Sequence, residues 1–317
     1  MEKSVLLTGG CGFIGSHLAE AYVKEGYQVV VVDNLSSGKI KNLDGIKNNS
    51  NLVIYNIDIR DQEKLFEIID KHRPTLINHH AAQKSVPYSV ENPVYDVTEN
   101  LIGLLNLVLA CKEYPIKNFI YISSGGALSK EIIGDDRSSE SDAPQLESPY
   151  AITKYAGENY IKLYSKLFNF QYTGLRYGNV YGPRQIKDGE CGVIPIFVEN
   201  TINNTPSILM TYDDMPNGCT RDYVYVKDVV TANMLATNNP INDIVNISSS
   251  DEICIMDVYN CIQEVFETSV AINKQGPRLG DVRRSVLCNE KAKRVLGWEP
   301  KTDIMNGLRD IKKSYSL

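Results

Sequence analysis

The N-terminal half of the chain alternates short apolar runs with longer segments that repeat apolar positions at helical spacing. Continuous apolar strands are typical of a sheet covered on both faces, and strands that alternate with helices form parallel sheets. The pattern therefore predicts an α/β fold built on a doubly wound parallel sheet. The predicted strands are 4–8, 28–33, 51–56, 75–79, 118–122 and 173–176, and the predicted helices are 13–25, 62–71, one within 92–112, and 150–169.

The second half of the chain follows a less regular pattern. Residues 130–148 are polar and acidic, which indicates a surface loop, and beyond residue 179 Gly, Pro and Asn become frequent. We therefore predict a first domain over 1–178, with a return segment near 223–245, and a smaller α/β domain over 179–317. Right-handed crossovers place the carboxyl ends of the parallel strands along one edge, where ligands bind.

A glycine-rich turn joins the first predicted strand to the first predicted helix. Gly9, Gly12 and Gly15 have the spacing GxxGxxG, which allows a tight turn, close backbone approach to a pyrophosphate and close helix packing. The helix N-terminus then offers unpaired N–H groups to phosphates. Asp33 ends the second strand, where an acidic side chain accepts hydrogen bonds from the adenosine ribose and repels a 2′-phosphate. These features predict a Rossmann-type NAD site.

Two neighbouring features bear on that cofactor site. Lys39 and Lys41 lie close to Asp33 in the sequence and weaken the preference for NAD over NADP. Asp58 and Ile59 follow the third strand at the same sheet edge, where they can meet the adenine, although a carboxylate there is also typical of an ordinary turn.

A tyrosine and a lysine stand four residues apart at the start of the predicted helix after the acidic loop. Tyr150 and Lys154 therefore share one helix face. An ammonium about 5 Å from a phenol lowers the phenol pKa by about two units at an effective dielectric near 20. Together with a positive nicotinamide ring, this predicts a tyrosine pKa near neutrality, which suits a general base. The serine pair Ser123 and Ser124 ends the strand before it.

Composition narrows the function classes. The chain has 317 residues and a net charge of −6, which argues against nucleic-acid binding because such proteins usually present a basic face. We find neither a run of about 18 apolar residues nor a signal-peptide pattern, so a membrane span is not expected. Seven cysteines without a CxxC pair and four histidines predict reduced thiols in the cytoplasm and no metal site.

Nine stretches of the chain carry a recognisable signature. They are TGGCGFIGSHL at 8–18, VVDNLSSG at 31–38, NHHAAQKSV at 78–86, FIYISSGGA at 119–127, SPYAITKY at 148–155, LRYGNVYGPRQ at 175–185, TRDYVYVKDV at 220–229, RLGDVRRS at 278–285 and LGWEP at 296–300. Over essentially its whole length the chain resembles the extended short-chain dehydrogenase/reductase family, and within it the UDP-galactose/UDP-N-acetylglucosamine 4-epimerase type. The resemblance implies NAD as cofactor, a UDP-sugar as substrate and inversion at C4 through a transient 4-keto sugar.

The resemblance also implies roles for individual residues. Tyr150 is the implied acid and base, Lys154 its partner on the nicotinamide ribose, and Ser124 the group that binds the sugar 4-hydroxyl. The implied cofactor residues are Gly9, Gly12, Phe13, Ile14, Gly15, Asp33, Asn34, Ser37, Gly38, Asp58, Ile59, His80, Ala81, Ala82, Lys84, Asn100, Ser123, Tyr150, Lys154 and Tyr177. The implied substrate residues are Lys84, Ser124, Tyr150, Asn179, Gly192, Val193, Arg221, Arg278, Asp281 and Ser285. Arginines suit a diphosphate because the guanidinium fork matches its oxygens. His79 and His80 end a strand without metal-like partners, which favours packing residues.

The chain departs from the family at one place. Family members usually follow the serine strand with Val/Ile-Tyr-Gly, but here the run is Ala127-Leu128-Ser129-Lys130. The missing aromatic lies near the sugar in that family, so the sugar preference is open at this point. Ser285 stands at the position that gates room for a 2-acetamido group, and its small side chain predicts acceptance of UDP-GlcNAc/UDP-GalNAc beside UDP-glucose/UDP-galactose.

Other functions remain open from the sequence. One alternative is a 4-epimerase of UDP-glucuronate or a UDP-pentose. Another is a 4,6-dehydratase, which needs an Asp-Glu pair where this chain has Gly125-Gly126. A third is a catalytically silent binding protein, whose signature is a broken Tyr/Lys pair. Apolar stripes such as Leu101, Leu104, Leu105 and Val108 are explained first by core packing, but the family's helix pair predicts a homodimer through a four-helix seam.

Overall fold

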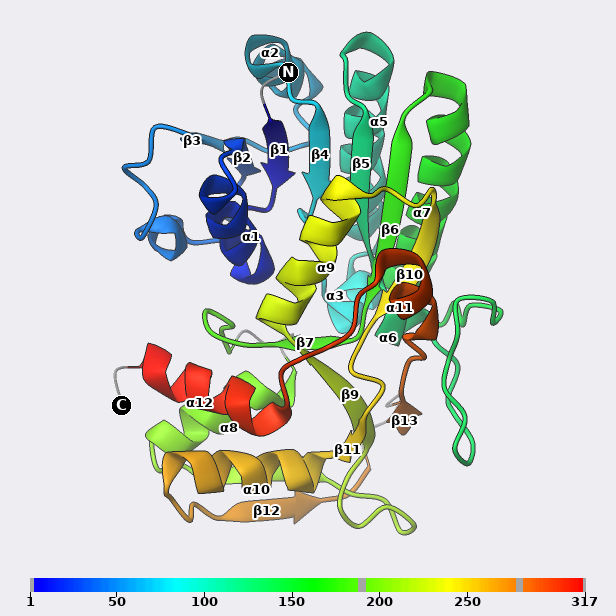
Figure 1. The fold of residues 1–317 in the computed structure, drawn as a ribbon. Helices are drawn as coiled ribbons and strands as arrows, with labels where there is room; N and C mark the ends of the chain where they lie inside the picture. Colours follow the sequence, from blue (N-terminus) through cyan, green and yellow to red (C-terminus); the bar gives the residue numbers. More distant parts are fainter. Residues whose placement is uncertain (1–2, 188–191, 278–281, 316–317) are drawn as a thin grey trace.

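The computed structural model describes residues 3–187, 192–277 and 282–315 (Figure 1). Its centre is a parallel sheet of seven strands in the order β10-β6-β5-β4-β1-β2-β3. The strands are β1 (Ser4–Thr8), β2 (Gln28–Asp33), β3 (Leu52–Asn56), β4 (Leu76–His79), β5 (Asn118–Ser124), β6 (Gln171–Tyr177) and β10 (Asp243–Ile247). The predicted α/β class with a doubly wound parallel sheet is confirmed.

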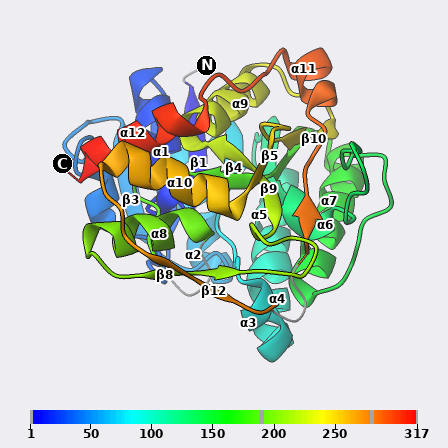
Figure 2. The same ribbon diagram turned by 90° about the horizontal axis from the view of Figure 1, so that it is seen from below.

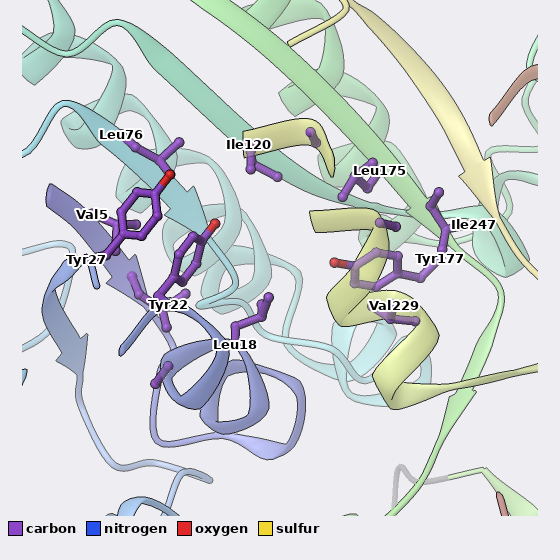
Figure 3. Packing of buried hydrophobic residues seen from close by; sticks show 14 of the residues in the cluster. Val5, Leu18, Tyr22, Tyr27, Leu76, Ile120, Leu175, Tyr177, Val229 and Ile247 are labelled. Atoms are coloured by element: carbon purple, nitrogen blue, oxygen red, sulfur yellow. The ribbon is translucent and has the colours of Figure 1, made fainter. Parts of the chain in front are cut away.

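Helices cover both faces of this sheet, as Figure 1 shows. On one face α1 (Phe13–Lys24) packs against α9 (Val226–Asn238), and their apolar side chains meet those of β1, β4, β5 and β6 (Figure 3). On the other face α2 (Gln62–His72), α5 (Gly103–Glu113) and α7 (Pro149–Phe168) enclose a second apolar cluster. The β-branched strands are buried on both sides, which is why they lack polar alternation.

The helix predicted within 92–112 is divided into three parts. It consists of α4 (Pro93–Val97), a π-helical turn η2 (Thr98–Ile102) and α5. A short helix, α3 (Val86–Glu91), precedes it. By length and composition Pro93–Glu113 is apolar enough to cross a membrane, but more than half of its most apolar window is buried and it packs on α7, as a core helix does.

A second layer lies below the carboxyl edge of the sheet, and Figure 2 shows it from below. There β7 (Asn179–Tyr181), β9 (Thr220–Tyr225), β11 (Glu252–Cys254) and β13 (Arg284–Ser285) form a small sheet, while β8 (Ser207–Met210) pairs with β12 (Ile272–Gln275). The helices here are α8 (Val193–Ile202), α10 (Ile255–Phe266) and α12 (Ile304–Ser314). Three short elements complete the chain: η1 (Ile40–Leu43), α6 (Gly125–Leu128) and α11 (Glu290–Leu296).

The return to the first layer begins after β9. β9 lies in the small sheet, whereas β10 belongs to the large sheet and α9 packs on it, so the returning elements span 226–247. The division of the chain into 1–178 and 179–317 as domains stays a prediction.

Candidate active site

The glycine-rich turn after β1 leaves no room for side chains. Gly9 has φ +69°, in the left-handed region that favours glycine. A Cβ on Gly15 would lie 2.1 Å from the Gly9 carbonyl oxygen, so α1 packs directly on the turn. Gly12 is the N-cap residue of α1 and no side chain caps the helix, which leaves its first N–H groups for a ligand. The turn therefore fits a pyrophosphate.

Asp33 is held rigidly at the end of β2. Its two carboxylate oxygens accept the N–H groups of Cys11 at 2.9 Å and Leu35 at 2.8 Å. A Cβ on Gly38 would lie 2.8 Å from both oxygens, so only glycine lets this loop pass so close. An acidic group fixed beside a phosphate-binding turn matches the ribose contact of a dinucleotide, and the residues present fit NAD.

Asp58 does not reach the cavity. Its carboxylate binds the guanidinium of Arg60 and the amide of Asn34, and the Arg60 hydrogen bond lowers the Asp58 pKa to about 2. The neighbours Ile57 and Ile59 line the cavity at this point, so the adenine end is apolar on this side. Asp58 is not among the residues that line the cavity, and its contact with the adenine stays a prediction.

The pair expected to carry the chemistry sits at the start of α7. Ser148 caps this helix by accepting the N–H of Ala151, and Pro149 occupies the first turn, where its missing N–H costs nothing. Tyr150 and Lys154 therefore point from one face towards the end of β5. The Lys154 Nζ donates to the Ile122 carbonyl at 3.1 Å and lies 5.8 Å from the centre of the Tyr150 ring.

The expected drop of the Tyr150 pKa to near neutrality includes the charge of the nicotinamide ring and stays a prediction, and the protein's own groups shift this pKa the other way. Burial raises the pKa of Tyr150 to about 12, while a hydrogen bond with Ser124 lowers it and Asp96 raises it. Burial also lowers the pKa of Lys154 to about 8, although the negative charges of Asp96 and Glu158 raise it. Burial removes water from both groups. The cost of desolvating the phenolate is therefore larger than the stabilisation that the desolvated Lys154 provides.

These elements enclose one cavity of about 390 Å³, a size typical of small-molecule sites. Every residue expected at the cofactor lines it except Asp58 and Asn100. The Asn100 amide instead donates to Asp96 at 3.0 Å and to the Gln83 carbonyl at 3.1 Å. His80 lines the cavity with its Nε2 3.1 Å from the Tyr177 hydroxyl, whereas His79 is buried against Thr8.

The expected substrate residues fall into three groups. Lys84, Ser124, Tyr150, Asn179 and Gly192 line the cavity, whereas Val193, Arg221 and Ser285 do not, and Arg278 and Asp281 lie outside the described residues. The Arg221 guanidinium donates to the carbonyls of Thr220 at 2.7 Å and Arg283 at 3.3 Å. Ser285 is 3% exposed, with its hydroxyl 3.1 Å from that of Ser129.

Sequence reasoning missed part of the cavity wall. The additional lining residues are Val32, Ser36, Asn42, Ile57, Glu99, Ile122, Gly178, Val180, Tyr181, Arg184, Gln185, Ile186, Ile194, Pro195 and Tyr223, while Lys39, singled out for its place near Asp33, lines the cavity as well. Arg184 follows β7 and binds Glu20 and Ser16 of α1. In the sequence, only the signature stretch 175–185 indicated a role for Arg184. No local pattern predicts that its side chain binds residues of α1.

The chain matches one known protein family over most of its length. A profile of the NAD dependent epimerase/dehydratase family matches residues 5–248. The chain is 35% identical to the UDP-glucose 4-epimerase of Mycolicibacterium smegmatis over 309 residues, which cover 96% of this chain and 95% of that protein.

Two solved structures share the whole architecture. A UDP-glucose 4-epimerase from Thermotoga maritima, solved with UDP-glucose, is 40% identical with a TM-score of 0.92 and covers 99% of this chain and 98% of its own. A UDP-N-acetylglucosamine 4-epimerase from Methanobrevibacter ruminantium, in complex with UDP-N-acetylmuramic acid, is 31% identical with a TM-score of 0.91 and covers 99% of this chain and 98% of its own.

Proposed function

The chain belongs to the NAD dependent epimerase/dehydratase family, and we propose that it is an NAD-dependent epimerase that interconverts the C4 epimers of UDP-hexoses. The observation that carries this proposal is the convergence of Ser124, Tyr150 and Lys154 on a cavity whose other end is the glycine-rich turn. A dinucleotide held at that turn places its reactive ring beside the three side chains.

The chain's own residues handle the proton in this reaction. Ser124 orients the sugar 4-hydroxyl, and Tyr150 removes the proton of this hydroxyl and later returns a proton to the same oxygen. Lys154 contributes a positive charge that favours the phenolate. NAD, when bound, supplies the oxidising equivalent that takes hydride from C4 and gives it back. Inversion then requires that the sugar turns while the nucleotide end stays anchored, and Asn179 is one anchor at that end.

The experiment is incubation with each of four UDP-sugars followed by NMR detection of the C4 epimer. UDP-glucose, UDP-N-acetylglucosamine, UDP-glucuronate and UDP-xylose distinguish hexose epimerisation from the acid and pentose alternatives. We expect UDP-galactose from UDP-glucose, with the equilibrium reached from either side. Absence of any epimer from all four substrates, with NAD bound, contradicts the proposal.

The dehydratase alternative lacks its acidic pair at α6, where this chain has Gly125 and Gly126. A Cβ on Gly125 would lie 2.2 Å from Leu287 Cδ1, so a side chain there must displace Leu287, whereas a Cβ on Gly126 has no atom within 4 Å. Formation of a 4-keto-6-deoxy sugar would nevertheless decide for that reaction.

We further propose that N-acetylated UDP-hexoses are substrates. Support comes from the small side chain of Ser285 and from the UDP-N-acetylglucosamine 4-epimerase among the similar structures. Ser285 is buried against Ser129 and does not line the cavity, so a tyrosine at 285 must displace that contact, and the proposed gate requires its ring to enter the cavity. Ser285→Tyr is therefore expected to reduce turnover of the N-acetylated sugar relative to UDP-glucose, with Ser129→Ala as control. If Ser285→Tyr leaves the ratio of N-acetylated sugar turnover to UDP-glucose turnover unchanged, residue 285 does not control access of the 2-acetamido group.

We also propose a homodimer through α4 and α7. Leu104 and Val108 are buried in the core, so they are not available for a seam. The exposed apolar residues are others: Val94 is 77% exposed on α4 and Leu167 is 62% exposed on α7, two helices that pack together. Covering such side chains with a second copy removes apolar surface from water.

A further inference from the structure

Three polar side chains form a buried cluster directly behind the catalytic residues. The Arg176 guanidinium binds the Glu158 carboxylate through two hydrogen bonds of 2.7 Å, one to each oxygen. The Ser123 hydroxyl donates to the same carboxylate at 2.6 Å. All three residues are between 3 and 7% exposed. No step of the proposed reaction uses Glu158 or Arg176.

Each member of the cluster is a direct neighbour of a residue that lines the cavity. Ser123 precedes Ser124 on β5, and Arg176 precedes Tyr177 on β6. Glu158 follows Lys154 by one turn of α7, on the same helix face. The carboxylate of one helix thus joins two adjacent strands at the point where all three deliver a side chain to the cavity.

Stability alone does not account for this cluster. A buried ion pair loses the hydration of both charges, and apolar side chains of similar volume are often as stable. What an ion pair with a third hydrogen bond does provide is direction, because the planar guanidinium and the carboxylate accept only a narrow range of positions. A sub-ångström tilt of α7 relative to β5 changes the distance between Tyr150 and Ser124, on which proton transfer depends.

We propose that Ser123, Glu158 and Arg176 are positioning residues that fix the start of α7 against β5 and β6, and so set the geometry of Ser124, Tyr150 and Lys154. The inference rests on the proposed function, since it concerns the same reaction. It assigns no contact with substrate or cofactor to Glu158 and Arg176, which do not line the cavity, whereas Ser123 lies at its wall. Their effect is expected on the chemical step and not on binding.

Tyr121 of β5 makes a second contact with α7, near Lys154. Its hydroxyl donates to the Lys154 carbonyl at 3.2 Å, and its ring lies 5.6 Å from the Lys154 Nζ. A Cβ on Gly157 would lie 2.1 Å from the Tyr121 hydroxyl, so a glycine is required for this approach. The helix is therefore tied to β5 at the turn that carries Lys154 and again, through Glu158, one turn later.

The test begins with Ser123→Ala, which releases the tie to β5 and leaves both charges paired. We expect kcat for UDP-glucose epimerisation to fall by about tenfold or more, because a small misplacement near the reacting groups has effects of this order. KM and NAD affinity are expected to stay within about twofold if Ser123 acts by position alone. Because Ser123 also lines the cavity, a larger loss of NAD affinity would assign the effect to a cofactor contact and contradict the positioning role. Ser165→Ala is the matched control, because it removes another buried hydroxyl from the far end of α7, where Ser165 donates to the Lys162 carbonyl.

A second pair of variants separates geometry from charge. The titratable and charged groups around Lys154 are Asp96 of α4, Tyr150 and Glu158 of α7, Tyr121 of β5, and His79 and His80 at the end of β4. Glu158→Gln leaves Arg176 unpaired, and this added positive charge moves the acidic limb of the kcat profile to lower pH. The double variant Glu158→Gln, Arg176→Met removes both charges. The acidic limb of its kcat profile is therefore expected near the wild-type pH, while kcat stays low because the positioning contact is lost.

The outcomes are distinguishable. Wild-type protein without epimerase activity contradicts the proposed function. Active wild type together with a Ser123→Ala kcat equal to that of Ser165→Ala contradicts the positioning role. Loss of kcat in Val108→Ala, a core variant in α5 away from the cluster, to the same extent as in the double variant would mean that lowered stability alone explains the effect.

Discussion

The substitution Gly15→Ala tests whether the turn after β1 is the cofactor site. A Cβ at this position lies 2.1 Å from the Gly9 carbonyl oxygen and 2.9 Å from the Gly10 Cα. Non-bonded carbon and oxygen atoms rarely approach closer than about 3.3 Å, so the turn and α1 must separate by about 1 Å. Both contacts are with backbone atoms, and therefore no side-chain rotation relieves them.

The magnitude follows from the cost of such a displacement. Overpacking of one methyl group in a tight site costs about 1–3 kcal/mol. If the turn relaxes in the free protein and must close again on NAD, this energy appears as weaker binding. At 1.4 kcal/mol per tenfold change, the NAD dissociation constant rises by about 5- to 150-fold.

The assay is calorimetric titration of nucleotide-free protein with NAD, together with thermal unfolding with and without NAD. Gly45→Ala is the control, because a Cβ there has only the Glu20 carboxylate within 4 Å, at 3.8 Å. A relaxed turn predicts a small change in the Tm of the free protein and a large loss of the shift that NAD produces. Wild-type NAD affinity in Gly15→Ala would refute the assignment of the turn to the pyrophosphate.

Three further predictions concern the site and the surface. Tyr150→Phe removes the group that transfers the proton and should lower kcat by about 10²- to 10⁴-fold in the NMR assay while NAD still binds; near-normal turnover contradicts the assignment. Because burial lowers the Lys154 pKa to about 8, the ammonium is present below this pH and lost above it, so kcat should fall on the alkaline side. A flat rate profile through that range contradicts this role of Lys154. Leu167→Glu places a charge in the proposed seam and should give monomers in sedimentation; wild-type protein that is already monomeric at low micromolar concentration refutes the dimer.

The strand pattern and the glycine spacing were sufficient for the architecture and for most of the cofactor half. Buried parallel strands need apolar residues on both faces, and a turn that touches a phosphate needs glycine, so each requirement leaves a local trace in the sequence. The extent of β6 and the π-helical turn at Thr98–Ile102 were less well predicted. Their limits depend on pairing with β10 and on packing, which local sequence does not record.

The sequence by itself determined which residue types were available for the reaction: a tyrosine and lysine one turn apart, a serine at a strand end and an acidic residue after β2. Only the tertiary structure decided their state. Burial raises the Tyr150 pKa. Arg60 binds the Asp58 carboxylate, which does not line the cavity, and Arg176 binds Glu158 behind the site. The physical reason is that desolvation and ion pairing depend on what lies beside a group in space, and these neighbours come from distant parts of the chain.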